Sequence, residues 1–384
     1  MWFCSYLYKV RIRSMNNKES LVGTKGLNAL KGIGAIFIAF VYHYKAHFLV
    51  DNPPFELIFN PFYAYGYMMV ELFFILCGFG MMIGYADKII NGQITFGAFL
   101  IKRINKIYPL FLFALLLVTV GQLLFKYEYG DIYLHSNFDL YHFLINLLLI
   151  QNGIFGTEMS FNTPGWCISI YILLYIAFYL IVRHSAHKRY VVYKFLGLSL
   201  VGILLIQSGW NLPIMNGQVG RGLLSFSIGV VIAYIYEKRD ILNTRMLSLL
   251  ALFILIGTYV YIRCIDVSLI KQLQYIFTIF IFPLLIFGVI FSENMNKILS
   301  LSIFQYLGGI SMEIYLLHFP IQVLFKDYEI YFHHGFDFEL HRTWFGYVII
   351  TIATASAYKY LINARLTSLL KRIIVRKSLL CVKK

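Results

Sequence analysis

The residues best suited to chemistry stand near the two ends of one apolar run, residues 27–48, LNALKGIGAIFIAFVYHYKAHF. Lys31 lies near its start, whereas His43 and His47 lie near its end. Ionisable groups on an apolar helix are costly, so they usually face a polar interior or an interface. A histidine takes a proton from a hydroxyl near neutral pH, which makes His43 a candidate general base. An interfacial histidine that hydrogen-bonds a neighbour explains His43 equally well, and this structural role is favoured for His47.

A second group of candidates is cationic and consists of Lys31, Arg103 and Lys106. Arg103 and Lys106 are three positions apart, so on a helix they share a face. Such a cluster is suited to the phosphates of a cytosolic cofactor, because a guanidinium group grips phosphate through two hydrogen bonds. Basic residues also flank the cytoplasmic ends of most membrane helices, and on spacing alone this topological explanation is favoured.

Other polar side chains fall within apolar segments. Glu71 needs a partner to stay ionised there, and a histidine would serve, although an interhelical hydrogen bond is the structural alternative. Tyr315 and His318 share a helix face in GGISMEIYLLHFP, but His318 precedes Phe-Pro and is equally suited to partner a helix kink. The remaining candidates are Trp166, Ser169, Arg221 and Glu313.

The amino-acid composition indicates the class of protein to which these residues belong. The chain has 384 residues, of which 60% are hydrophobic and only 13% are charged, whereas a soluble domain carries about 25% charged residues. This indicates a polytopic membrane protein. The net charge of +15 arises beside the apolar spans, as in cytoplasmic loops, and does not indicate nucleic-acid binding. The five cysteines are scattered without a CxxC pair, so we expect neither a metal site nor a disulfide framework.

The charge pattern predicts an all-α fold of about ten transmembrane helices with both termini in the cytoplasm. A basic segment, 1–26, precedes a membrane domain, 27–363, and a basic tail, 364–384, which suits an inner-leaflet helix. The apolar segment 140–155 is short and interrupted by polar residues, so we interpret it as re-entrant; if it spans instead, the basic loop 183–194 lies outside. The predicted spans are 27–48, 63–85, 107–125, 165–182, 191–207, 220–236, 246–263, 273–291, 303–325 and 344–363.

Four blocks of the chain resemble, in the correct order, those of the acyltransferase 3 family of bacterial membrane O-acyltransferases. They are LNALKGIGAIFIAFVYHY, VELFFILCGFGMMIGY, FLIKRINKIYPLF and GGISMEIYLLHFP. NTPGWCISI and GQVGRGLLSFSIGVVIAY resemble the family's tryptophan and Arg-Gly blocks. Lys31 and Lys106 stand where many members have arginine, and Tyr171 stands where glutamate often follows the tryptophan block. The family's acidic C-terminal block is not recognisable near Ile362.

The resemblance implies a cytoplasmic acyl-CoA donor, usually acetyl-CoA, and a hydroxyl of a cell-surface glycan or its lipid-linked precursor as acceptor. It also implies a location in the bacterial cytoplasmic membrane and chemistry without a bound metal or permanent cofactor. We expect the cationic residues to hold the nucleotide phosphates, while His43, oriented by Glu71, deprotonates the acceptor or relays the acyl group covalently. The weaker substrate-binding candidates are Trp166, Arg221, Tyr315 and His318.

Two other functions suit an aromatic-rich membrane protein. A transporter or flippase for a polyprenyl-linked glycan predicts pseudo-symmetry between halves and helices broken by Gly or Pro at matching positions, and the sequence shows neither clearly. A glycan polymerase would be expected to have long external loops rich in arginine, whereas the external loops here are short. The ordered blocks favour the acyltransferase.

Overall fold

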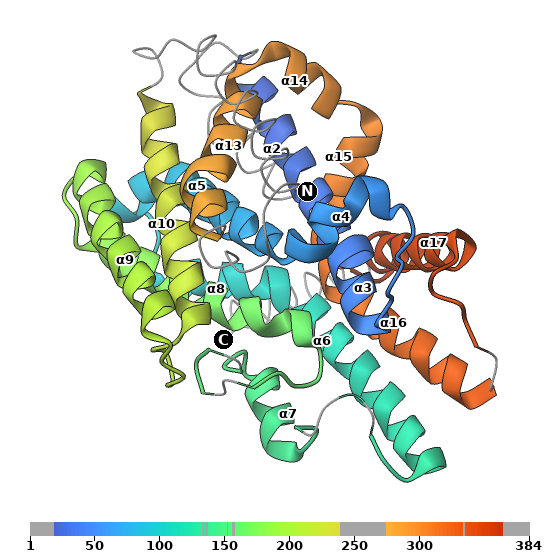
Figure 1. The fold of residues 1–384 in the computed structure, drawn as a ribbon. Helices are drawn as coiled ribbons and strands as arrows, with labels where there is room; N and C mark the ends of the chain where they lie inside the picture. Colours follow the sequence, from blue (N-terminus) through green and yellow to red (C-terminus); the bar gives the residue numbers. More distant parts are fainter. Residues whose placement is uncertain are drawn as a thin grey trace, which may run out of the picture.

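The computed structural model describes residues 19–132, 134, 137–151, 153–155, 158–238, 274–332 and 335–363. Within these ranges the chain is a bundle of helices without a named strand (Figure 1). Its first half contains α2 Glu19–Ile36, η1 Phe37–Tyr42, α3 His43–Phe48, α4 Glu56–Tyr65, η2 Gly66–Met68, α5 Met69–Ile90, α6 Phe96–Tyr129, α7 Leu140–Leu147, η3 Thr163–Gly165 and α8 Trp166–Arg183. Its second half contains α9 Lys188–Ser208, α10 Gly217–Glu237, η6 Phe277–Ile281, α13 Phe282–Phe291, α14 Glu293–Leu299, α15 Ser302–Gly309, α16 Ser311–Phe332, α17 His341–Ala357 and η7 Tyr358–Asn363.

Several of these helices are long and apolar enough to cross a bilayer, which confirms an all-α, multi-pass membrane protein. The described residues contain eight such segments, and a ninth if the bent pair α15 and α16 is one span. With the bent pair counted as one span, these segments match nine of the ten predicted spans. The other predicted span, 246–263, lies outside the described residues, as do 1–18 and the tail 364–384. The segments are Lys25–Phe48, Glu56–Ile90, Phe96–Tyr129, Thr163–Arg183, Lys188–Ser208, Gly217–Glu237, Gln274–Phe291 and His341–Asn363.

The segment 140–155 agrees with the expectation that it does not span. Among its described residues, 140–151 and 153–155, the one helix is α7, which has 8 residues and is therefore ~12 Å long. A hydrocarbon core is about 30 Å thick, so α7 is too short to cross it.

Helices α5 and α10 pack backbone against backbone because two glycines permit it. A Cβ added to Gly78 would lie 2.1 Å from a carbonyl oxygen of α10, and one added to Gly229 would lie 2.0 Å from a carbonyl oxygen of α5. No other residue type fits at such distances. Since α5 carries Glu71 and α10 carries Arg221, this close contact fixes how these two side chains meet.

The opening helical segment, predicted as the span 27–48, is interrupted by a π-helical turn. The π-turn η1 separates α2 from α3, and α3 begins at His43. A π-turn holds an additional residue, and each extra residue rotates the following side chains by about 100°. Two side chains of α17 hold η1 in place: Trp344 donates to the carbonyl of Phe40 (2.7 Å), and Tyr347 donates to that of Ala39 (3.1 Å). The turn therefore sets the direction of His43.

A sharp bend between α15 and α16 places the helix that faces His43. The two helices meet at 63°, and the ammonium group of Lys359 donates to the carbonyl of Gly309 at the break. Gly308 lies so close to α2 that an added Cβ would be 2.1 Å from the carbonyl oxygen of Asn28. As a result α15 packs on α2, whereas α16 contacts η1 and α3 as well as α2 (Figure 1).

We expect the variant Gly229→Ala to lower the melting temperature of the detergent-solubilised protein. Alanine improves helix propensity by about 0.5–1 kcal/mol. Overpacking costs about 1–3 kcal/mol or more, and it dominates here because the clash is with backbone of α5, which cannot rotate away. The matched control is Gly97→Ala in α6, where an added Cβ meets nothing within 4 Å. Equal melting temperatures for the two variants would contradict the close packing.

Candidate active site

The central contact joins two histidines from opposite ends of the chain. Nδ1 of His43 lies 2.7 Å from Nε2 of His318, and the ring centroids are 4.9 Å apart. His318 on α16 is fully buried, whereas His43 at the start of α3 is partly exposed. The pair therefore joins a partly exposed ring to a fully buried one.

The pairing of Glu71 differs from the prediction. Oε1 of Glu71 accepts from Nε of Arg221 at 2.6 Å and from Nε2 of Gln274 at 3.0 Å, so Glu71 does not orient His43. The carboxylate is 1% exposed, and a guanidinium group, which is always charged, neutralises a buried carboxylate better than a histidine does. His318 takes the position beside His43 that was expected for Glu71.

Arg221 lies among aromatic rings. Its guanidinium carbon is 5.0 Å from the ring centroid of Trp166 and 5.6 Å from that of Tyr67. Three of the predicted site residues, Glu71, Trp166 and Arg221, thus form one cluster. Tyr67 and Gln274 complete it and were missed, because a tyrosine in an aromatic-rich chain and a glutamine at the start of a span give no distinctive signal.

Tyr315 connects this cluster with the histidine pair. Its ring centroid lies 6.0 Å from that of His318, and it is close enough to Arg221 and Glu71 to interact with both electrostatically. Its hydroxyl donates to the carbonyl of Pro164 at 2.9 Å. Tyr315 is buried, so it braces the site through contacts with the protein.

The structure also decides the role of the Phe-Pro sequence after His318. Pro320 lies inside α16 and lacks an N–H, so the carbonyl of Leu316 loses its helical donor. The side-chain amide of Asn162 donates to that carbonyl at 3.1 Å. Asn162, and not His318, is therefore the partner at the proline, which leaves His318 available to His43.

The predicted cationic residues come together. Lys31 and Arg103 both act electrostatically on Lys106, and all three act on Cys77. The guanidinium of Arg103 lies over the Tyr85 ring, 4.4 Å from its centroid, and donates to its hydroxyl. Because α2 and α3 lie on one continuous helical segment, Lys31 and His43 stand at separate ends of it.

Glu313 belongs with these cations. It is buried on α16 and acts electrostatically on Lys106 and on Lys359. Glu313, a candidate from the sequence, therefore lies with the cationic residues.

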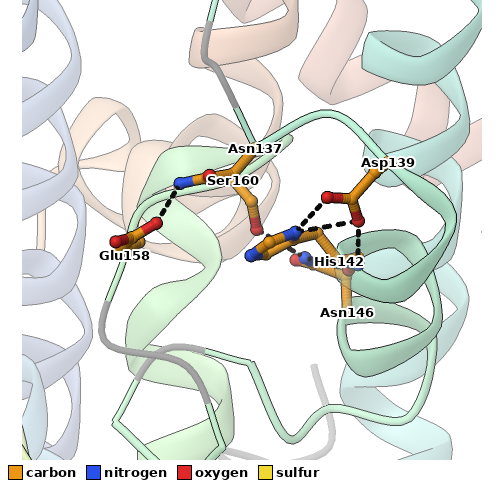
Figure 2. A network of polar contacts seen from close by, with 6 residues as sticks. All are labelled: Asn137, Asp139, His142, Asn146, Glu158 and Ser160. Carbon is orange, nitrogen blue, oxygen red and sulfur yellow. Dashed lines mark hydrogen bonds and ion pairs between the residues drawn. The ribbon is translucent and has the colours of Figure 1, made fainter.

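A further polar cluster surrounds α7 and the loop before α8 (Figure 2). Asp139 caps α7, and hydrogen bonds from the backbone and ring of His142 hold the pKa of this carboxyl below its usual range. Asn146 donates to Ser160 at 2.9 Å, while Asn137 donates to Glu158 at 2.6 Å. A small cavity next to this cluster is lined by Asn146, Gln151, Met159, Ser160, Asn162, Thr163 and Trp166. Of these residues, Asn162, Thr163 and Trp166 lie in the block NTPGWCISI, and no motif marked the others in the sequence.

These features define a multi-pass helical membrane protein with a histidine pair and a separate cationic cluster. A family model described as an acyltransferase domain matches residues 24–359, so the chain belongs to the acyltransferase 3 family. A stretch of 93 residues is 35% identical to "Protein 2 in picA locus" of Rhizobium radiobacter and covers 24% of this chain and 42% of that protein. The chain thus aligns with less than half of that relative. No solved structure matches. Family membership supports an acyltransferase activity.

The ion pair between Glu71 and Arg221 yields a stability prediction. Glu71→Ala leaves the guanidinium of Arg221 without its carboxylate, and breaking a buried pair in this way costs about 3–5 kcal/mol. We expect a large fall in melting temperature, whereas Glu293→Ala at the exposed start of α14 should change it little. Combining Glu71→Leu with Arg221→Met removes both charges and should recover most of the loss. A single variant as stable as the wild type would show that the pair contributes nothing to stability.

Proposed function

We propose that the protein transfers an acyl group, acetyl in the first instance, from cytoplasmic acyl-CoA to a hydroxyl of a cell-surface glycan or its lipid-linked precursor. The observation that carries this proposal is the placement of a partly exposed histidine, anchored by a buried one, away from a cationic cluster whose Lys31 lies on the same helical segment as His43. Family membership supports acyl transfer over the alternative of a transporter or flippase.

In the proposed reaction His43 acts as the general base. It removes the proton of the acceptor hydroxyl while the oxygen attacks the thioester carbonyl. A new C–O ester bond forms, the C–S bond breaks, and the proton held by His43 passes to the departing thiolate. The products are the acylated glycan and free CoA. The open alternative is a covalent relay in which the acyl group rests on His43 before the hydroxyl attacks.

The donor would be held at the other end of the opening helix. Lys31, Arg103 and Lys106 supply positive charge for the nucleotide phosphates, and Arg103 offers a planar set of donors suited to phosphate oxygens. The 12 positions from Lys31 to His43 correspond to ~18 Å of helix, across which the pantetheine arm would extend. In this arrangement acyl-CoA is a substrate, and the bound phosphates remain on the cytoplasmic side of the bacterial membrane.

The acceptor would approach through the polar cluster around α7. Amide and hydroxyl side chains there hydrogen-bond to sugar hydroxyls, and Trp166 adds an aromatic surface beside the cavity. Asn162 links this region to α16 only two residues before His318. A hydroxyl-rich acceptor therefore finds matching chemistry near the histidine pair.

The variant His43→Ala should lose acyl transfer. Purified protein is supplied with radiolabelled acetyl-CoA and candidate glycans, and label in the glycan is measured. Since a general base contributes about 10²–10⁴-fold, the rate should fall by that factor, whereas His341→Ala, at the exposed start of α17, should retain activity. Transfer that survives in His43→Ala would reject His43 both as base and as acyl carrier.

The variant Arg103→Ala should raise the KM for acyl-CoA. A hydrogen bond to a charged group contributes about 1.5–3 kcal/mol, so the increase should be about tenfold or more, with a smaller change in kcat. Arg189→Ala on the exposed surface of α9 is the matched control. An unchanged dependence on donor concentration would remove Arg103 from the phosphate site.

A further inference from the structure

We propose that His318 is a positioning residue that fixes the tautomer of His43, an inference that rests on the proposed function. Both ring nitrogens of His318 are engaged. Nδ1 lies 3.2 Å from the carbonyl oxygen of Ile314, and Nε2 lies 2.7 Å from Nδ1 of His43. These two contacts, taken in order, determine where the protons are.

The carbonyl of Ile314 is the starting point, because a carbonyl oxygen only accepts hydrogen bonds. Nδ1 of His318 must therefore carry the proton. In a neutral imidazole the other nitrogen is then an acceptor, so Nε2 of His318 accepts from Nδ1–H of His43. His43 is consequently protonated on Nδ1, and its Nε2 carries the free lone pair. The backbone of α16 thus specifies, through one histidine, which nitrogen of the other is basic.

The surroundings of His318 hold this arrangement in place. Its side chain is fully buried, which disfavours a charged ring and leaves the neutral form with one defined tautomer. The rings of His43 and His318 are only 13° from parallel, and Tyr347 donates to the backbone carbonyl of His318 at 3.5 Å. Because Asn162 satisfies the carbonyl freed by Pro320, α16 runs through this region as one helix.

The tautomer matters for the chemistry of His43. A neutral histidine side chain in water prefers the proton on Nε2, and in that form the exposed nitrogen would donate to the acceptor hydroxyl instead of accepting its proton. With the proton on Nδ1, Nε2 takes the hydroxyl proton, and the resulting imidazolium keeps its Nδ1–H bond to His318. His318 thereby stabilises the charged intermediate without touching the substrate. In the acyl-relay alternative the same lone pair on Nε2 is the nucleophile.

Nitrogen NMR of the full-length protein tests this directly and needs no turnover. Protein labelled with ¹⁵N-histidine is measured in detergent at a pH at which His43 is neutral, and the signal of His43 is assigned by its loss in His43→Ala. The expected result is a protonated Nδ1 and an unprotonated Nε2. A protonated Nε2 on His43 in the wild type would overturn the inference.

Two variants at one position separate positioning from mere packing. His318→Gln places an amide oxygen near the position of Nε2 and should keep the Nδ1–H tautomer of His43. His318→Leu removes the acceptor, so the Nε2–H form should appear and kcat should fall at least about tenfold, with the KM for acyl-CoA unchanged. Partial rescue by Gln supports the inference.

A leucine variant that folds and keeps the wild-type tautomer would refute the inference. If His318→Leu fails to fold, the tautomer of His43 in the wild type and in His318→Gln tests the inference. A wild-type Nδ1–H tautomer in a protein that transfers no acyl group would leave the positioning role standing and reject the proposed function, so the two failures are distinguishable.

Discussion

The structure depends on one constraint: polar side chains buried among apolar helices must satisfy one another. His43 meets His318, and Glu71 meets Arg221 and Gln274. Each contact joins segments far apart in sequence, so each ties one part of the bundle to another. Because an unpaired buried charge or amide is costly, these contacts also restrict how the helices pack.

Irregularities in the helix backbone bring these side chains into contact. The π-turn η1 changes the direction in which His43 points, and the break before α16 brings His318 to meet it. Where helices must approach most closely, as α5 and α10 do at Gly78 and Gly229, only a missing side chain allows it. These departures from regular helix geometry therefore bring the polar groups within hydrogen-bonding distance.

The cationic cluster and the histidine pair have different roles in the proposed reaction. The cationic cluster of Lys31, Arg103 and Lys106 suits a charged, phosphate-bearing donor, whereas the histidine pair suits proton transfer. Keeping them apart prevents the cations from disfavouring a positive charge on His43 during the proposed reaction. The opening helical segment carries a member of each cluster and so sets the distance between them.

The sequence by itself determined the class of fold, because apolar runs long enough to cross a bilayer are visible in composition alone. It also singled out His43, the three cations, and Glu71 with Arg221, since ionisable residues are conspicuous in apolar helices. Only the tertiary structure decided the partners. Glu71 was expected beside His43 but pairs with Arg221, because the glycine contact between α5 and α10 is not encoded in any local pattern. The tautomer of His43 likewise depends on Ile314, 271 positions along the chain. Partner choice depends on which helices touch, and periodicity within a single helix carries no information about that.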